Sequence, residues 1–495
     1  MPLNNKIIFL SFLISINIFS IKNISLPIYI DPEKQFYYYT KLFYGEEKAP
    51  QALSLDTTSS IITSPCNLCK TCGYHSNEWY NMTNKEDQIL NCNSSICGSL
   101  SGNCLNNQCS YKYDYYEDAY VKGIYVNEEI FFDYNSLQSY NITIGCTLNE
   151  TNYIIAQDSD GIMGLNNDEN SFINLLYKSK IIKNNIFTIF LRQDNSGYFS
   201  IGRINRKYHS SKIINYVPFF IDEEKYYKLE INSFEINNQK INNIYSAIID
   251  TTATLTSFPK DIFDLIVKEF DKKCTEDLCG KLIKNRHFGV CAFFNYENEM
   301  MTKIKNWLKI TINFNKYNYE WDPTNYWVNI TTEHTFRACL GFESTKEKVI
   351  TLGTTFMHGY DVIFNRDKNK IGFVKVDPNQ EFIFNNSIHD FKEEEMVDND
   401  SYNFKEEEMI NNDSNKFINT SLYNNLRVNK KAKIIKFSLI FSIFIISFII
   451  IIISINIFGQ KYNKKRKRYK KNIYINKMNK KSKYRDKEEI HFLYK

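Results

Sequence analysis

One acidic turn occurs twice in this chain of 495 residues. Residues 53–65 read LSLDTTSSIITSP and residues 247–259 read AIIDTTATLTSFP, which places Asp56 and Asp250 in matching contexts. Two carboxylates held about 3 Å apart cannot both ionise, so they share one proton. Such a pair can activate a water molecule with one carboxylate while the other donates a proton to a carbonyl oxygen. Either aspartate alone is an ordinary turn residue, but the repeat predicts a pair that hydrolyses peptide bonds.

The segments around the two turns predict β structure. From about residue 36 to residue 376, short runs of β-branched and aromatic residues alternate with Asn, Asp and Gly turns, as in GYFSIG and YYKLEI. Apolar residues recur at helical spacing in 171–180 and 260–274, where we expect helices. Because each acidic turn lies in its own half, we expect a mainly β fold of two lobes with a cleft between them.

These motifs resemble the pepsin family of aspartic proteases, and the resemblance covers nearly all of residues 36–376. The segments that carry it are YYYTKLFYGEEKAPQALSLDTTSS, SDGIMGL, GYFSIGRIN, AIIDTTATLTSFP and VITLGTTFMHGYDVIFNRDKNKIGFV. A cysteine cluster directly after the first turn, together with an apolar C-terminal run, is similar to the nepenthesin-type branch. The resemblance implies a bilobed fold, an active-site cleft between the lobes, no metal or other cofactor, and Asp56 and Asp250 as the catalytic residues.

The chain departs from the family pattern next to both aspartates. The family has Asp-Thr-Gly or Asp-Ser-Gly, whereas this chain has Thr58 and Thr252 in the glycine positions. If those positions require a glycine-like backbone, a β-branched residue is strained there. Ser59 can supply the hydroxyl that supports the first aspartate in the family, but the equivalent residue after the second aspartate is Ala253. Thr58, Ser59 and Thr252 are expected to line the substrate site.

A third departure lies in the hairpin that covers the cleft in the family. YYEDAYVKG aligns with that hairpin, which makes Tyr115 the flap tyrosine and puts Asp118 in place of a glycine. We expect both residues to face the substrate. The loss of glycine from the flap and from both aspartate turns favours a second interpretation, in which the fold binds peptides or proteins without cleaving them.

Cysteine usage indicates an oxidising compartment. The cysteines form two even groups, eight in residues 66–146 and four in residues 274–339. We expect disulfides that close within each group, although spacing alone does not give the pairing. The run CNLCKTC also suits thiolate ligands of zinc, and this alternative stays open at this stage. The expected disulfide residues are Cys66, Cys69, Cys72, Cys92, Cys97, Cys104, Cys109, Cys146, Cys274, Cys279, Cys291 and Cys339.

The two ends of the chain predict a membrane protein of the secretory pathway. A positive residue followed by IIFLSFLISINIF is typical of a signal peptide, with a retained anchor as the alternative. Residues 436–458 are long and apolar enough to span a bilayer, and the basic run KYNKKRKRYKK follows them on the cytoplasmic side. The expected organisation is a signal peptide at 1–24, β lobes at 36–205 and 206–376, an acidic spacer at 377–433, a transmembrane helix at 436–458 and a basic tail at 459–495.

Together these observations predict a membrane-anchored aspartic endopeptidase with a luminal or extracellular catalytic part. Its partners would be protein or peptide substrates and the membrane, which the chain crosses once in type I orientation; we expect a monomer. The net charge of +5 comes largely from the tail, so a nucleic-acid partner is not expected. We find no P-loop, no G-x-G-x-x-G and no G-x-S-x-G motif. The alternative function is a catalytically inactive peptide-binding or protein-binding membrane protein.

Overall fold

A computed structural model describes residues 24–30, 38–115, 118–192, 197–237, 239–285, 288–331 and 335–377. No helix within these ranges is both long and apolar enough to cross a bilayer. The expected spacer, transmembrane helix and basic tail lie outside the described residues, apart from Asp377, as does the expected signal peptide apart from its last residue.

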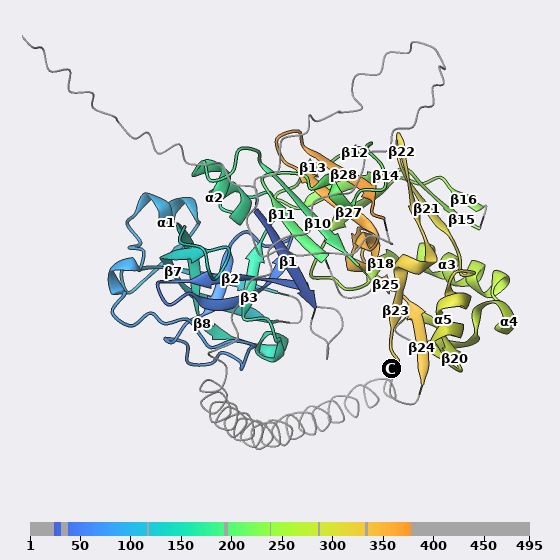
Figure 1. Cartoon of the computed structure of the whole chain (residues 1–495), viewed down its shortest axis with the longest axis horizontal. Coiled ribbons are helices and arrows are strands. Elements are labelled where there is room, and N and C mark those ends of the chain that lie inside the picture. Colours follow the sequence, from blue (N-terminus) through green and yellow to red (C-terminus); the bar gives the residue numbers. More distant parts are fainter. Residues whose placement is uncertain are drawn as a thin grey trace, which may run out of the picture. The chain divides into compact units, whose positions relative to one another are not determined.

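The N-terminal half is built on one large sheet, which three strands from the C-terminal half extend (Figure 1). The strand order is β12-β28-β27-β10-β11-β1-β2-β3-β9-β4-β8-β7-β6-β5. In chain order the strands are β1 (Ile24–Ile30), β2 (Tyr38–Tyr44), β3 (Ala49–Asp56), β4 (Ile62–Pro65), β5 (Asn103–Leu105), β6 (Gln108–Asp114), β7 (Tyr120–Phe131), β8 (Tyr140–Glu150), β9 (Gly161–Gly164), β10 (Ile186–Leu191), β11 (Gly197–Ile201), β12 (Asn215–Pro218), β27 (Tyr360–Asn365) and β28 (Lys370–Lys375).

Three smaller sheets form the C-terminal half. One sheet has the order β13-β14-β17-β26-β18-β25, and the others have the orders β16-β15-β21-β22 and β19-β20-β24-β23. The strands are β13 (Phe220–Ile221), β14 (Tyr227–Ile231), β15 (Ser233–Ile236), β16 (Gln239–Ile241), β17 (Tyr245–Ile249), β18 (Thr256–Pro259), β19 (Lys281–Asn285), β20 (Gly289–Phe294), β21 (Ile310–Phe314), β22 (Tyr317–Trp321), β23 (Trp327–Asn329), β24 (Phe336–Leu340), β25 (Phe342–Thr345) and β26 (Ile350–Leu352). The prediction of a mainly β, two-lobed fold is confirmed.

Helices are few and mostly short. They are α1 (Ser95–Ser99), α2 (Phe172–Lys178), α3 (Lys260–Lys273), α4 (Glu276–Cys279), α5 (Glu297–Ile304), α6 (Pro323–Tyr326) and α7 (Thr354–Met357). Both helices expected from apolar periodicity are present, as α2 and α3. In α3, Ile262, Ile266 and Phe270 are buried at intervals of four residues, which gives the helix one apolar face toward the core.

The first strand lies before the expected beginning of the N-terminal lobe. β1 pairs antiparallel with β11 and with β2, and alternating residues Ile24, Leu26 and Ile28 are buried. Apart from Ile24, its sequence, ISLPIYI, falls in the interval between the expected signal peptide at 1–24 and the expected lobe at 36–205, which was assigned to neither. Any cleavage that preserves β1 must therefore occur before Ile24.

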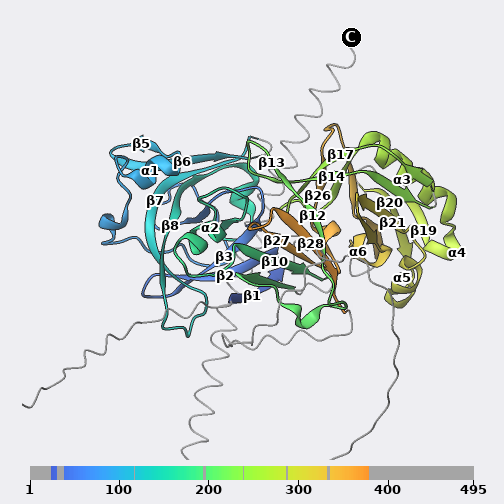
Figure 2. The same cartoon turned by 90° about the horizontal axis from the view of Figure 1, so that it is seen from above.

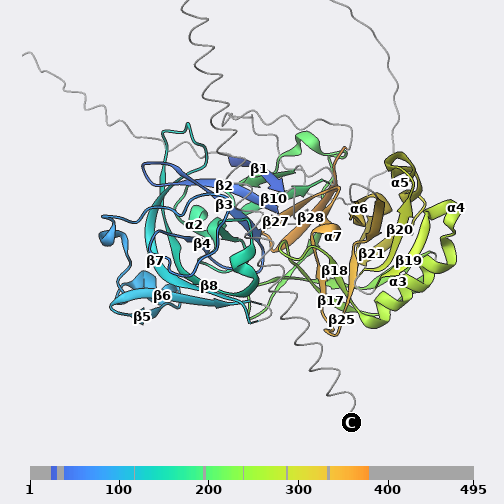
Figure 3. The ribbon, with the colours of Figure 1, turned by 90° about the horizontal axis from the view of Figure 1, so that it is seen from below.

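The two halves share a central group of strands. β27 pairs antiparallel with β10, from Ile186 opposite Asn365 to Phe190 opposite Asp361, and β28 continues the sheet to β12. Seen from above and from below, β27 and β28 lie between the N-terminal strands and the helices α3 to α5 (Figures 2 and 3). The lobes are therefore joined by backbone hydrogen bonds as well as by side-chain packing.

All twelve cysteines are paired, and no bridge crosses between the two groups. In CNLCKTC, each cysteine is engaged in a disulfide rather than available as a thiolate. The bridges are Cys66–Cys146, Cys69–Cys72, Cys92–Cys104, Cys97–Cys109, Cys274–Cys279 and Cys291–Cys339.

Candidate active site

The two acidic turns occupy equivalent places in the two lobes. β3 ends at Asp56 and pairs parallel with β9, while β17 ends one residue before Asp250 and pairs parallel with β26. Each lobe has one glycine that packs too closely against the aspartate loop to carry a side chain. A Cβ on Gly164 would lie 2.4 Å from the backbone nitrogen of Ile61, and a Cβ on Gly353 would lie 2.4 Å from the backbone oxygen of Leu255. In each lobe, therefore, the backbone at this glycine packs directly against the loop that carries the aspartate.

The first threonine of each Asp-Thr-Thr, Thr57 or Thr251, forms hydrogen bonds to the aspartate loop of the other lobe. The Thr57 hydroxyl donates to the oxygen of Ile249 at 2.7 Å, and the Thr251 hydroxyl donates to the oxygen of Leu55 at 2.6 Å. Each backbone N–H of these threonines also donates to the hydroxyl of the other, at 3.1 Å in both directions. Both side chains are buried. This reciprocal arrangement fixes the two aspartate loops against each other.

Asp56 is buried and receives several hydrogen bonds. Its Oδ1 accepts from the backbone N–H of Thr58 at 2.7 Å, the Thr58 hydroxyl at 2.6 Å and the backbone N–H of Ser59 at 3.1 Å. Its Oδ2 accepts from the Ser59 hydroxyl. That hydroxyl lies 3.5 Å from the Tyr115 hydroxyl. Both oxygens of this carboxyl group therefore accept hydrogen bonds.

Asp250 has a similar but smaller set of donors. Its Oδ1 accepts from the backbone N–H of Thr252 at 2.8 Å, the Thr252 hydroxyl at 2.7 Å and the backbone N–H of Ala253 at 3.2 Å. Burial and the charge of Asp56 raise the pKa of Asp250, and the hydrogen bonds from Thr252 and Ala253 oppose that rise. The two carboxyl groups therefore interact electrostatically, as a proton-sharing pair requires.

The expectation of strain at Thr58 and Thr252 is wrong. Neither residue has a positive φ, so the backbone does not need glycine at these positions. Each threonine keeps the N–H that the family's glycine would supply, and its hydroxyl adds a second hydrogen bond to the same carboxylate oxygen. The sequence comparison correctly located the two departures, but their effect is an added donor rather than backbone strain.

The flap hairpin is present between β6 and β7. The Tyr115 N–H donates to the oxygen of Ala119 at 2.7 Å, which closes the hairpin one step beyond the strand pair. Burial and the negative charge of Asp56 raise the pKa of Tyr115, so this residue stays neutral near the carboxyl pair. Asp118 is exposed and has a φ of 55°, the left-handed conformation for which glycine is favoured. Aspartate thus replaces glycine at a position whose backbone conformation favours glycine.

Three residues near the pair were not selected from the sequence. Thr57 and Thr251 belong to the repeated motif, and their identity in both copies was a usable signal. Tyr226 precedes β14, and its pKa is raised by burial and then by nearby carboxylates that include Asp56 and Asp250. No local motif marks Tyr226, because it reaches the pair only through the β13–β14 hairpin.

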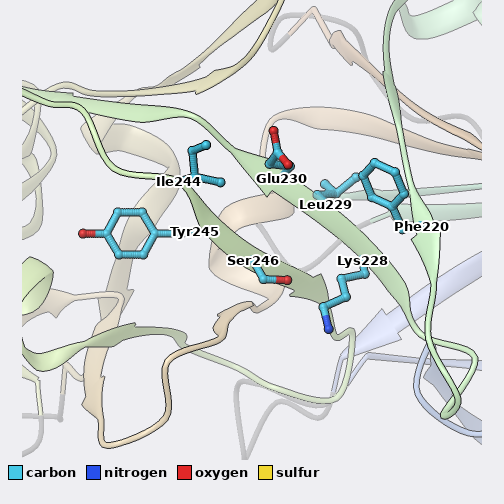
Figure 4. A pocket seen from close by; sticks show the side chains of 7 residues that line it. All are labelled: Phe220, Lys228, Leu229, Glu230, Ile244, Tyr245 and Ser246. Atoms are coloured by element: carbon cyan, nitrogen blue, oxygen red, sulfur yellow. The ribbon is translucent and has the colours of Figure 1, made fainter.

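A groove of about 340 Å³ lies on the sheet that contains β17, the strand that ends one residue before Asp250 (Figure 4). In β17, Ala247 and Ile249 are buried, whereas Ser246 and Ile248 point to the opposite face, which Asp250 continues by alternation. The groove lies along this second face. Its lining combines exposed apolar side chains with one positive and one negative charge: Phe220, Lys228, Leu229, Glu230, Ile244, Tyr245 and Ser246.

No group of three or more His, Cys, Asp or Glu side chains is arranged to hold a metal ion within the described part of the chain. The hydroxyl and amide groups around the aspartates donate hydrogen bonds to the carboxylate oxygens. The chemistry that these residues can perform is therefore general acid–base catalysis by the carboxyl pair.

Two matching lobes, each with an aspartate loop, and a flap define a pepsin-like aspartic protease fold. Residues 37–376 match the family model described as eukaryotic aspartyl protease, and the chain belongs to that family. It is 23% identical to plasmepsin V of Plasmodium falciparum over 456 residues, covering 75% of this chain and 76% of that protein. Over 118 residues it is 30% identical to nepenthesin-1 of Nepenthes gracilis, covering 23% of this chain and 26% of that protein.

A solved structure with the same fold is conglutin gamma, a basic 7S globulin from lupine seeds. The TM-score is 0.56, the sequence identity is 16%, and the match covers 71% of this chain and 95% of that one. This likeness supports the two-lobed β fold and gives no information about activity.

Proposed function

We propose that the protein is an aspartic endopeptidase that hydrolyses peptide bonds in protein substrates with Asp56 and Asp250. The observation that carries this proposal is the matched environment of the two carboxyl groups. Equivalent loops, held together by Thr57 and Thr251, present each aspartate with hydrogen-bond donors from the second and third residues after it. Family membership supports the same activity.

The unequal donors suggest how the pair divides its work. Asp56 accepts hydrogen bonds at both oxygens, whereas the bonds to Asp250 that the structure describes all reach Oδ1. We therefore assign the ionised state to Asp56 and the shared proton to Oδ2 of Asp250. Asp56 takes a proton from the attacking water while Asp250 donates its proton to the carbonyl oxygen, which gives a neutral tetrahedral intermediate. In its collapse the C–N bond breaks as Asp56 gives the proton taken from water to the leaving nitrogen and Asp250 takes a proton from one hydroxyl of the intermediate, which restores the starting protonation of the pair.

A second candidate is a pepsin-like protein that binds peptides without cleaving them. Asp118 favours it, since this residue brings a charge and a left-handed backbone to the flap where the family pattern has glycine. We give priority to the enzyme because the carboxyl pair, its donors and the loop lock are all retained.

The test of the enzyme is cleavage of a peptide library by the purified full-length protein. Asp56→Asn and Asp250→Asn preserve side-chain size but cannot share a proton as the carboxyl pair does, so each should abolish cleavage. Binding of peptides by all three proteins with no cleavage by any would support the second candidate. Cleavage that survives both substitutions combined would exclude the aspartic mechanism.

We further propose that the enzyme works in the secretory pathway or at the cell surface as a type I, single-pass membrane protein and a monomer. The disulfides, the similarity to plasmepsin V and the apolar run at 436–458 support this location. Protease protection in sealed microsomes tests it, since only residues after 458 should be digested.

N-glycosylation offers an independent test of that location. Three sequon asparagines, Asn81, Asn93 and Asn141, are exposed, whereas the Asn149 side chain donates a hydrogen bond to Thr71 and is partly buried. In a luminal protein, glycans should be found on the exposed three in preference to Asn149. Peptide mass spectrometry before and after glycosidase treatment measures this, and the absence of all glycans would argue against a luminal domain.

A further inference from the structure

One hydroxyl group next to Asp250 has no equivalent in the family pattern. On the Asp56 side, the residue three places on, Ser59, donates its hydroxyl to the carboxylate, but the corresponding Ala253 has none. Instead, the Thr252 hydroxyl donates to Asp250 Oδ1 at 2.7 Å. We propose that Thr252 is a positioning residue whose hydroxyl stabilises the ionised form of Asp250, which receives no hydroxyl from Ala253; on the other side Asp56 receives hydroxyls from both Thr58 and Ser59. This inference rests on the proposed function.

The surroundings of Asp250 disfavour its ionised form, which the Thr252 hydroxyl stabilises. Asp56 faces it from the other lobe, and Tyr226 approaches from the segment before β14, with Asp222 and Glu224 close to that tyrosine. Tyr115 faces Asp56 from the flap. Burial and the charge of Asp56 both oppose ionisation of Asp250. Among the hydrogen bonds that lower the pKa of Asp250, the one from the Thr252 hydroxyl has the largest effect.

The hydroxyl should therefore affect one limb of the pH profile. With Asp56 ionised and Asp250 protonated in the active form, ionisation of Asp250 sets the alkaline limb of kcat/KM. Thr252→Val keeps the shape and the N–H but loses the hydroxyl, which favours the protonated form and moves this limb to higher pH. A hydrogen bond to a charged group corresponds to about one to two pH units, and we expect about one because water can replace part of it at the exposed Thr252.

Three variants of the full-length protein separate this role from a structural one. Thr252→Val should move the alkaline limb up by about one unit and leave the acid limb in place, and Thr252→Ser should restore the wild-type profile. Thr252→Gly, the family form, should behave like the valine variant. An unchanged alkaline limb in Thr252→Val, or a shift that Thr252→Ser does not reverse, would overturn the inference.

Thermal unfolding provides a readout that does not need activity. The raised pKa of Asp250 means that its ionisation destabilises the fold as pH rises, and loss of the hydroxyl increases that cost. The difference in Tm between wild type and Thr252→Val should therefore grow with pH. A matched control is Thr354→Val, which removes a buried hydroxyl that donates to the oxygen of Thr254 at 3.1 Å and should lower Tm equally at every pH.

The two readouts distinguish the possible failures. If the wild type cleaves nothing but the Tm difference still grows with pH, the proposed enzyme fails and the role of Thr252 stands. If the enzyme is active but the difference between wild type and Thr252→Val is independent of pH, the inference fails and the proposed function stands.

Discussion

Replacing Thr251 with valine should show how strongly the two aspartate loops depend on each other. The Thr251 hydroxyl donates to the oxygen of Leu55 and accepts from the N–H of Thr57, and all three residues are buried. Valine fills the same volume but leaves one carbonyl and one N–H without these partners. Each unsatisfied buried group costs about 1–3 kcal/mol, so we expect a loss of about 3 kcal/mol in the free energy of unfolding.

That loss corresponds to a lower Tm by about 4 °C, given an unfolding entropy of about 2.1 cal/mol/K per residue over roughly 350 folded residues. Differential scanning calorimetry measures the shift, and Thr251→Ser, which retains the hydroxyl, should recover most of it. Because the same bonds hold the carboxyl pair in register, kcat should fall at least about tenfold in Thr251→Val. A Tm within about 1 °C of wild type, or a serine variant as unstable as the valine variant, would refute the argument.

Three further predictions concern the flap, a buried histidine and the groove. Asp118→Gly should raise the free energy of unfolding by up to about 1 kcal/mol in urea titrations, because the left-handed backbone at this position is strained for aspartate; a loss of stability would contradict this. Burial lowers the pKa of His358 to about 4, so stability should fall by up to about 3 kcal/mol as pH drops from about 6.5 towards 4, and His358→Gln should flatten that dependence. Phe220→Ala and Ile244→Ala should raise KM several-fold for long peptides but not for short ones, and equal effects on both would exclude the groove from substrate binding.

The sequence was sufficient to predict the general fold and the position of the candidate pair. Repetition of Asp-Thr-Thr in two β-rich halves pointed to Asp56 and Asp250 because the same local chemistry recurs at equivalent strand ends. Even cysteine groups anticipated bridges within each half, although the pairing itself depends on which loops the fold brings together.

The details of the site could not be derived in the same way. From the sequence, Thr58 and Thr252 were expected to strain the backbone. Their backbone angles and the directions of their hydroxyl groups depend on how each loop packs, which the sequence does not give. Tyr226 is brought towards the carboxyl pair by a hairpin and has no motif of its own. Strand β1 was missed because it lies before the expected lobe and pairs over most of its length with β11, far along the chain, so no local hairpin marks it.

The pairing of β10 with β27 affects how the protein is made. β10 ends at Leu191, but the strand that covers its edge begins only at Tyr360. At about 5–20 residues per second, the roughly 170 residues between them take on the order of 10–30 s to synthesise. Throughout that interval the N-terminal half has a strand edge with free hydrogen-bonding groups, which is prone to pairing with other chains. A nascent chain that stops before residue 365 therefore carries an incomplete sheet, and β27 and β28 must be added before the carboxyl pair is fixed in place.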